Sequence, residues 1–91
     1  MNIKHAQYML TVMQEGSITA AAKKLYISQP SLSQMIKLVE TNLGTPIFNR
    51  STDPITLTYA GEKYIEAAKQ ILTINNNLQK EIDEINHEDH G

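Results

Sequence analysis

The chain has 91 residues and a hydrophobic content of 41%, values typical of one small globular domain. It contains no cysteine, which excludes disulfides, thiolate metal sites and a cysteine nucleophile. No apolar run approaches the length needed to cross a bilayer and the N-terminus lacks a signal-peptide pattern, so we expect a cytoplasmic location and no membrane partner. A core of this size is marginal, and an oligomer would add stability.

The formal net charge of −2 is unevenly distributed along the chain. Residues 1–79 carry seven cations and five anions, a balance of +2, whereas residues 80–91 carry one lysine and five acidic residues, a balance of −4. A mildly basic body with an acidic tail is a weak electrostatic footprint for a nucleic-acid-binding protein. DNA binding would therefore depend on base contacts, on a second copy of the chain, or on both.

Two short helices are predicted at the N-terminus. Apolar residues recur on one face of residues 3–15, and Gly16 follows as a stop. Ser17 is the expected N-cap of a second helix, residues 18–25, which contains three consecutive alanines. Small side chains allow another helix to cross closely, as the corner of a helix-turn-helix unit requires.

A third helix is predicted over residues 29–42, after a two-residue turn. The hydroxyl of Ser28 suits an N-cap, and Pro30 lies near the helix start, where its missing N–H costs little. Gly44 is expected to end the helix. The spacing of four, three and four residues predicts one buried stripe made of Leu32, Ile36, Val39 and Leu43.

The other face of this third helix is polar and carries no bulky apolar group. Hydroxyl, amide and ammonium groups of this kind bind base edges and phosphates. The pattern indicates a candidate recognition helix whose polar face consists of Gln29, Ser31, Ser33, Gln34 and Lys37.

The periodicity changes after the third helix. Residues 46–50 and 55–58 are two short runs with β propensity around a turn-rich tetrapeptide, and they predict a small hairpin. Thr58 is the expected N-cap of a final helix over residues 59–86, which at 1.5 Å per residue would be about 40 Å long. Residues 87–91 are predicted to form a disordered acidic tail.

The final helix has a heptad pattern, with apolar positions alternating between spacings of four and three. Such a seam is typical of a coiled coil, and one polar position within it can fix the register. The alternative is an amphipathic helix that lies on its own domain. We favour pairing with a second copy through the seam Tyr64, Ala68, Ile71, Asn75, Leu78, Ile82 and Ile85.

The order of these elements and their residues resembles the N-terminal DNA-binding domain of LysR-type transcriptional regulators. The resemblance covers nearly the whole chain and implies a mainly α fold: a winged helix-turn-helix of three helices and a β-hairpin wing (residues 1–58), followed by a long linker helix that pairs two subunits. The ligand-sensing domain of the family has no counterpart in these residues. The similarity is carried by residues 16–22, Leu25, 27–33, Ile36, Glu40, 43–44, Phe48, Arg50 and 57–61.

A role in binding two-fold operator DNA follows from the resemblance together with the polar face. The third helix would enter the major groove, with glutamine amides on adenine, serines on bases or phosphates, and the lysine on a phosphate. A helix start at the second helix and an arginine in the wing would supply further backbone contacts. The expected DNA-binding residues are Ser17, Thr19, Ser28, Gln29, Pro30, Ser31, Ser33, Gln34, Lys37 and Arg50.

Two departures from the family pattern leave two possibilities for the wing: either its DNA contacts are weaker, or Asp53 points into its own turn as a local cap. Members often carry further arginines in the wing, where this chain has Asp53 and Thr56, and many have arginine at the position of Gln34. A rival interpretation is therefore a short interaction module that heterodimerises with a full-length regulator through its long helix. The weak net charge and Asp53 favour that alternative, and the intact surface around Gln29 disfavours it.

An enzymatic function is not expected. The sequence has no glycine-rich phosphate loop, no nucleophile motif and no paired carboxylates outside the acidic tail. His87 and His90 lie in the polar terminus, which we interpret as a solvated end and not as a set of ligands. No metal or cofactor is therefore predicted.

Overall fold

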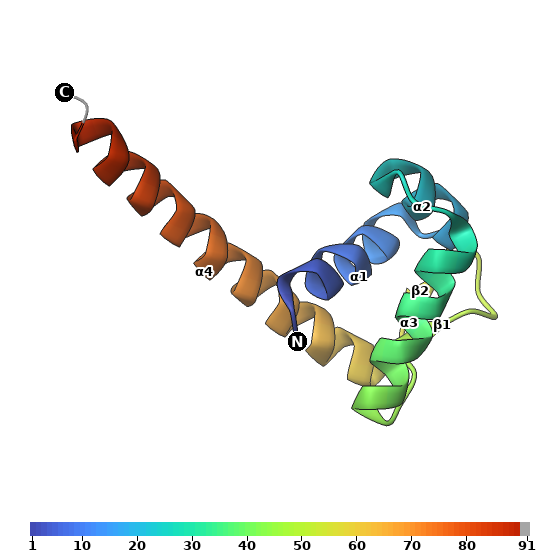
Figure 1. The fold of residues 1–91 in the computed structure, drawn as a ribbon. Coiled ribbons are helices and arrows are strands. Elements are labelled where there is room, and N and C mark those ends of the chain that lie inside the picture. The colour runs from blue at the N-terminus through green and yellow to red at the C-terminus, as the bar shows by residue number, and fades with distance from the viewer. Residues whose placement is uncertain (90–91) are drawn as a thin grey trace.

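A computed structural model describes residues 1–89, and in this part of the chain the fold consists of four helices and a two-stranded hairpin (Figure 1). This arrangement confirms the predicted mainly α, winged helix-turn-helix fold with a long last helix. The elements in chain order are α1 (Ile3–Glu15), α2 (Ile18–Leu25), α3 (Gln29–Leu43), β1 (Phe48–Asn49), β2 (Thr56–Leu57) and α4 (Tyr59–Asp89).

Side-chain caps begin the first three helices. The Asn2 carboxamide oxygen accepts the N–H of His5 at 2.7 Å, which caps α1. Ser17 and Ser28 cap α2 and α3, because each hydroxyl accepts the N–H of the residue three positions later, at 3.2 Å in both cases. Both serine caps confirm the sequence prediction, and both satisfy an amide of the first helical turn.

Each of these three helices ends on a residue in the left-handed conformation. Gly16 (φ 69°) ends α1 and Gly44 (φ 84°) ends α3, as predicted. Tyr26 ends α2 with a φ of 58°, and it is the one non-glycine residue with a positive φ in residues 1–89. Glycine adopts this conformation readily, whereas a residue with a Cβ does so at an energetic cost.

The core lies where α1, α2 and α3 meet the hairpin and the first turns of α4. Leu32, Ile36 and Val39 are buried in it, which confirms three positions of the predicted stripe on α3. The prediction is wrong for Leu43, which is 46% exposed. Leu43 lies in the last turn of α3, at the open end of the helix, where it borders a surface pocket together with Tyr64.

The wing is a minimal antiparallel hairpin. Phe48 pairs with Leu57 and Asn49 pairs with Thr56, so each strand is shorter than the predicted run around it. The backbone N–H of Ile55 donates to the carbonyl of Gly16, the residue that ends α1, at 2.9 Å. This bond attaches the loop of the wing to the helical body.

The last helix, α4, extends well beyond the body (Figure 1), and the largest dimension of the chain is 55 Å. It continues to Asp89 instead of ending at residue 86, so residues 87–89 are helical and the predicted tail boundary is wrong. No glycine or proline interrupts residues 62–89, and the Gln79 amide donates to Asp83 one turn later at 3.0 Å.

Residues 90–91, including His90, lie outside the described part. No helix within residues 1–89 has the length and apolar character of a membrane span.

Candidate nucleic-acid interface

The polar face of α3 is open to solvent in this chain. Gln29, Ser33 and Lys37 follow one another at intervals of four, and Pro30 and Gln34 form a parallel row beside them. Residues three and four apart are neighbours on a helix surface, so these five residues form one continuous strip. All are exposed except Ser33, which is half-buried. We call these five residues the polar strip.

The predicted serine and threonine contacts divide into two groups. Ser17 and Ser28 use their hydroxyls as helix caps, and the Ser28 hydroxyl also donates to the Ser31 hydroxyl at 2.7 Å. The two Ser28 bonds fix the start of α3 and hold the Ser31 oxygen at its surface. Thr19 is exposed in the first turn of α2. Binding of DNA by these side chains stays a prediction.

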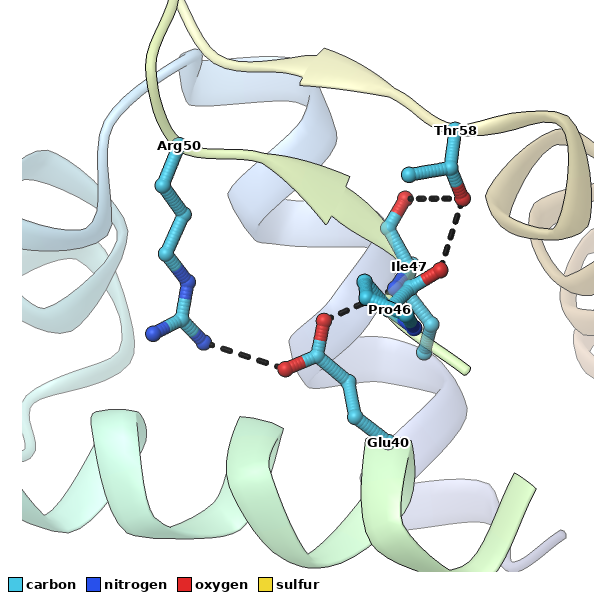
Figure 2. Close-up of polar contacts among 5 residues, drawn as sticks. All are labelled: Glu40, Pro46, Ile47, Arg50 and Thr58. Atoms are coloured by element: carbon cyan, nitrogen blue, oxygen red, sulfur yellow. Dashed lines mark hydrogen bonds and ion pairs between the residues drawn. The ribbon is translucent and has the colours of Figure 1, made fainter. Parts of the chain in front are cut away.

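Arg50 does not extend freely from the wing (Figure 2). Its guanidinium Nη2 lies 3.2 Å from Oε1 of Glu40, in the last turn of α3. The other carboxylate oxygen, Oε2, accepts the N–H of the fully buried Ile47 at 2.7 Å. One carboxylate therefore ties α3 to both ends of β1, and the Arg50 side chain, 48% exposed, is partly engaged in holding the wing. The sequence indicates both charged residues but not that they pair.

Thr58 joins the wing to the start of α4 (Figure 2). Its hydroxyl donates to the carbonyl of Pro46 at 2.7 Å and accepts the N–H of Gly61 at 2.9 Å, which confirms the predicted cap. Its backbone N–H donates to the carbonyl of Ile47 at 3.0 Å. A Cβ on Gly61 would collide with that same carbonyl, so the approach of α4 to the wing requires glycine there.

The predicted seam on α4 has a buried part in the first turns of the helix and an accessible part beyond them. Tyr64 and Ala68 are 8% and 0% exposed, because the first turns of α4 pack into the core of their own chain. A part for these two residues in a dimer interface stays a prediction. The remaining apolar seam residues are accessible, and Ile74 joins them at spacings of three and four. Ile74 is not part of the predicted seam, because the heptad pattern places its neighbour Asn75 there. The accessible stripe is Ile71 (half-buried), Ile74 (68% exposed), Leu78 (55%), Ile82 (43%) and Ile85 (53%).

The buried hydroxyl of Tyr64 has no hydrogen-bond partner within residues 1–89. Desolvation by burial raises the pKa of its phenol. The unfolded chain therefore ionises this group at a lower pH than the native chain, and stability falls as pH rises through the ordinary tyrosine pKa of about 10.

Tyr64→Phe is expected to raise the free energy of unfolding by about 1 kcal/mol, because it removes a buried polar group without a partner. Above about pH 10 the gain should grow, since phenylalanine cannot ionise. Urea unfolding at pH 7 and pH 10.5 measures both effects. A variant that is less stable than the wild type at pH 7 would show that the hydroxyl makes a stabilising bond.

The chain matches known proteins along most of its length. The family model described as "Bacterial regulatory helix-turn-helix protein, lysR family" matches residues 3–62. The chain is 32% identical to the HTH-type transcriptional regulator MetR of Haemophilus influenzae over 91 residues, which is 100% of this chain and 29% of that protein. It is 44% identical to the HTH-type transcriptional regulator BsdA of Bacillus subtilis over 73 residues, which is 79% of this chain and 25% of that protein. The chain thus spans between a quarter and a third of these relatives.

Solved structures with the same fold include complexes with DNA. The BenM_DBD complex with benA site 1 DNA superposes with a TM-score of 0.88 at 32% identity, covering 93% of this chain and 96% of that one. The CbnR_DBD–DNA complex gives a TM-score of 0.84 at 30% identity, covering 93% and 98%. The chain therefore belongs to the LysR family of bacterial regulatory helix-turn-helix proteins and is a winged helix-turn-helix DNA-binding domain of that family.

Proposed function

We propose that this chain binds operator DNA sequence-specifically as a two-fold dimer, with α3 in the major groove and the wing beside the backbone. The observation that carries the proposal is the polar strip. It is uncovered, it lies on the helix that follows the helix-turn-helix corner, and its scaffold is held by separate bonds through Glu40 and Thr58. Such a strip presents donors and acceptors to base edges without disturbing the core.

The chemistry of the polar strip suits direct readout. Gln29 and Gln34 each offer one acceptor and two donors, so each amide can pair with the major-groove edge of an adenine. Pro30 presents an apolar edge that fits a thymine methyl group. Lys37, two turns into α3, is placed for a phosphate. Arg50 can add a backbone contact with the guanidinium nitrogens that Glu40 does not occupy.

A second copy is part of the proposed function. One short helix reads few bases, whereas a two-fold dimer reads two half-sites of a palindrome. The accessible apolar stripe on α4 (Ile71, Ile74, Leu78, Ile82 and Ile85) supports such pairing, since exposed apolar rows of this length mark interaction surfaces. The acting location would be the cytoplasm, where bacterial DNA lies.

The proposal predicts that the polar strip contains residues of two kinds. Gln29→Ala should remove preference for the cognate site while leaving binding to random duplex unchanged, because a lost base pairing costs about 1–3 kcal/mol of discrimination. Lys37→Ala should weaken cognate and random duplex alike and reduce the salt slope by about one. A duplex selected from a random pool, compared with a scrambled duplex by fluorescence anisotropy at two salt concentrations, measures both quantities.

Equal behaviour of the two variants would contradict the assignment of base and phosphate roles. The exchange Lys69→Ala is a matched control for Lys37→Ala, because it removes one exposed cation from α4, away from α3. It should leave both affinities close to those of the wild type.

The accessible α4 stripe also favours a second candidate function. A short chain with this stripe could pair with a full-length regulator of the same family and inhibit it. The neutralisation of Arg50 by Glu40 supports this alternative, because it weakens the wing as a DNA anchor. Wild-type chain that binds neither selected nor random duplex at low salt would favour inhibition by pairing over DNA recognition.

A further inference from the structure

The helix-turn-helix corner contains an exposed tyrosine in an unfavourable backbone conformation. Tyr26 has a φ of 58°, in the region where α1 and α3 both use glycine at the corresponding helix end. Its residue is 95% exposed, so the phenol ring gains almost no packing inside the chain. A positive φ costs conformational free energy for a residue with a Cβ, and packing of the Tyr26 side chain within the chain does not offset this cost.

The backbone role of this position does not require the side chain. The N–H of Tyr26 donates to the carbonyls of Ala22 and Lys23 at the end of α2. Glycine would make the same bonds with less strain. The side chain therefore has to be explained by something outside the chain.

The surroundings of Tyr26 are cationic and border the polar strip. Tyr26 is two residues before Ser28, the cap from which α3 begins. Lys23, three residues before it, is exposed, and its side chain forms no ion pair within residues 1–89. The neighbouring Lys24 differs, because it lies 3.4 Å from the carboxylate of Glu15.

We propose that the Tyr26 phenol donates a hydrogen bond to a backbone phosphate at the edge of the half-site, and that Lys23 pairs with a neighbouring phosphate. This inference rests on the proposed function, because α3 in the major groove brings the turn before it to the groove wall. That wall is the sugar–phosphate backbone, and a phenol is a rigid donor suited to a phosphate oxygen. The contact would add affinity without adding sequence preference.

Four variants of the full chain test the proposal: Tyr26→Gly, Tyr26→Phe, Lys23→Ala and the control Tyr8→Phe, which makes the same chemical change on α1. Tyr26→Gly is expected to raise the Tm by about 4 °C, because it relieves the positive φ. The same variant should weaken binding about tenfold on selected and random duplex alike, through loss of a charge-assisted hydrogen bond. A gain in stability together with a loss of affinity is a result that a purely structural tyrosine cannot produce.

The other variants separate the hydroxyl from the ring. Tyr26→Phe should leave the Tm unchanged and weaken binding nearly as much as Tyr26→Gly, whereas Tyr8→Phe should leave binding unchanged. Lys23→Ala should reduce the salt slope by about one. If both Tyr26 variants bind as tightly as the wild type, the inference is wrong while the proposed function stands. If the wild type itself binds no selected duplex, both are wrong.

Discussion

Replacing Gly61 by alanine is expected to lower the free energy of unfolding by about 3 kcal/mol, the upper end of the usual cost of overpacking. The added Cβ would collide with the backbone carbonyl of Ile47, which cannot rotate away as a side chain could. That carbonyl also accepts the N–H of Thr58, so any shift strains the bond that starts α4. For a domain of this size the loss is a large part of the total stability.

Chemical denaturation followed by circular dichroism measures this effect. Gly44→Ala is the matched control, because Gly44 also has a structural need for glycine (φ 84°) but a Cβ there would meet no atom within 4 Å. Its cost should be about 1 kcal/mol, from backbone strain alone. Alanine favours a helix interior over glycine by up to about 1 kcal/mol. This preference can offset only part of the cost of the collision. A Gly61→Ala variant as stable as the wild type would therefore show that α4 can move away from the wing.

The second large effect concerns the accessible stripe on α4. Exchanging Leu78 and Ile82 for lysine together should convert dimers into monomers, because two charges would enter an apolar seam. Operator affinity should then fall by about a hundredfold or more, since the second half-site no longer adds to the first. Sedimentation velocity and anisotropy on a two-half-site duplex measure the two outcomes.

The control for this variant places two lysines on the opposite side of the same helix. Thr73→Lys combined with Asn76→Lys adds the same charge at exposed positions off the stripe and should leave the dimer intact. Circular dichroism checks that both variants keep their helix content. Dimers that persist after the Leu78 and Ile82 exchange would place the interface elsewhere.

Local signals predicted most of the fold. The caps Ser17, Ser28 and Thr58 mark the starts of α2, α3 and α4, and the structure confirms each through a bond to an amide three residues later. Capping depends on a few neighbouring residues, so it can be inferred from sequence. The predicted end of α4 at residue 86 is wrong, because a charged run without glycine or proline carries no clear stop signal.

Contacts between distant segments could not be predicted in the same way. The heptad pattern on α4 indicated an apolar face, but not that Tyr64 and Ala68 would cover the chain's own core. Likewise, a family-typical arginine in the wing suggested a DNA contact, while its pairing with Glu40 depends on how β1 crosses α3. Periodicity gives the direction of a side chain, and only the packing of the chain decides what it meets.

The bonds through Glu40 have a consequence for how DNA preference can change. The scaffold is held from the last turn of α3, through the Glu40 carboxylate that binds Ile47 and Arg50. The side chains of Gln29, Gln34 and Lys37 form no hydrogen bond or ion pair within residues 1–89. Substitutions at Gln29 and Gln34 should therefore exchange one operator preference for another at little cost to folding, and substitution of Lys37 should change overall affinity at an equally small cost.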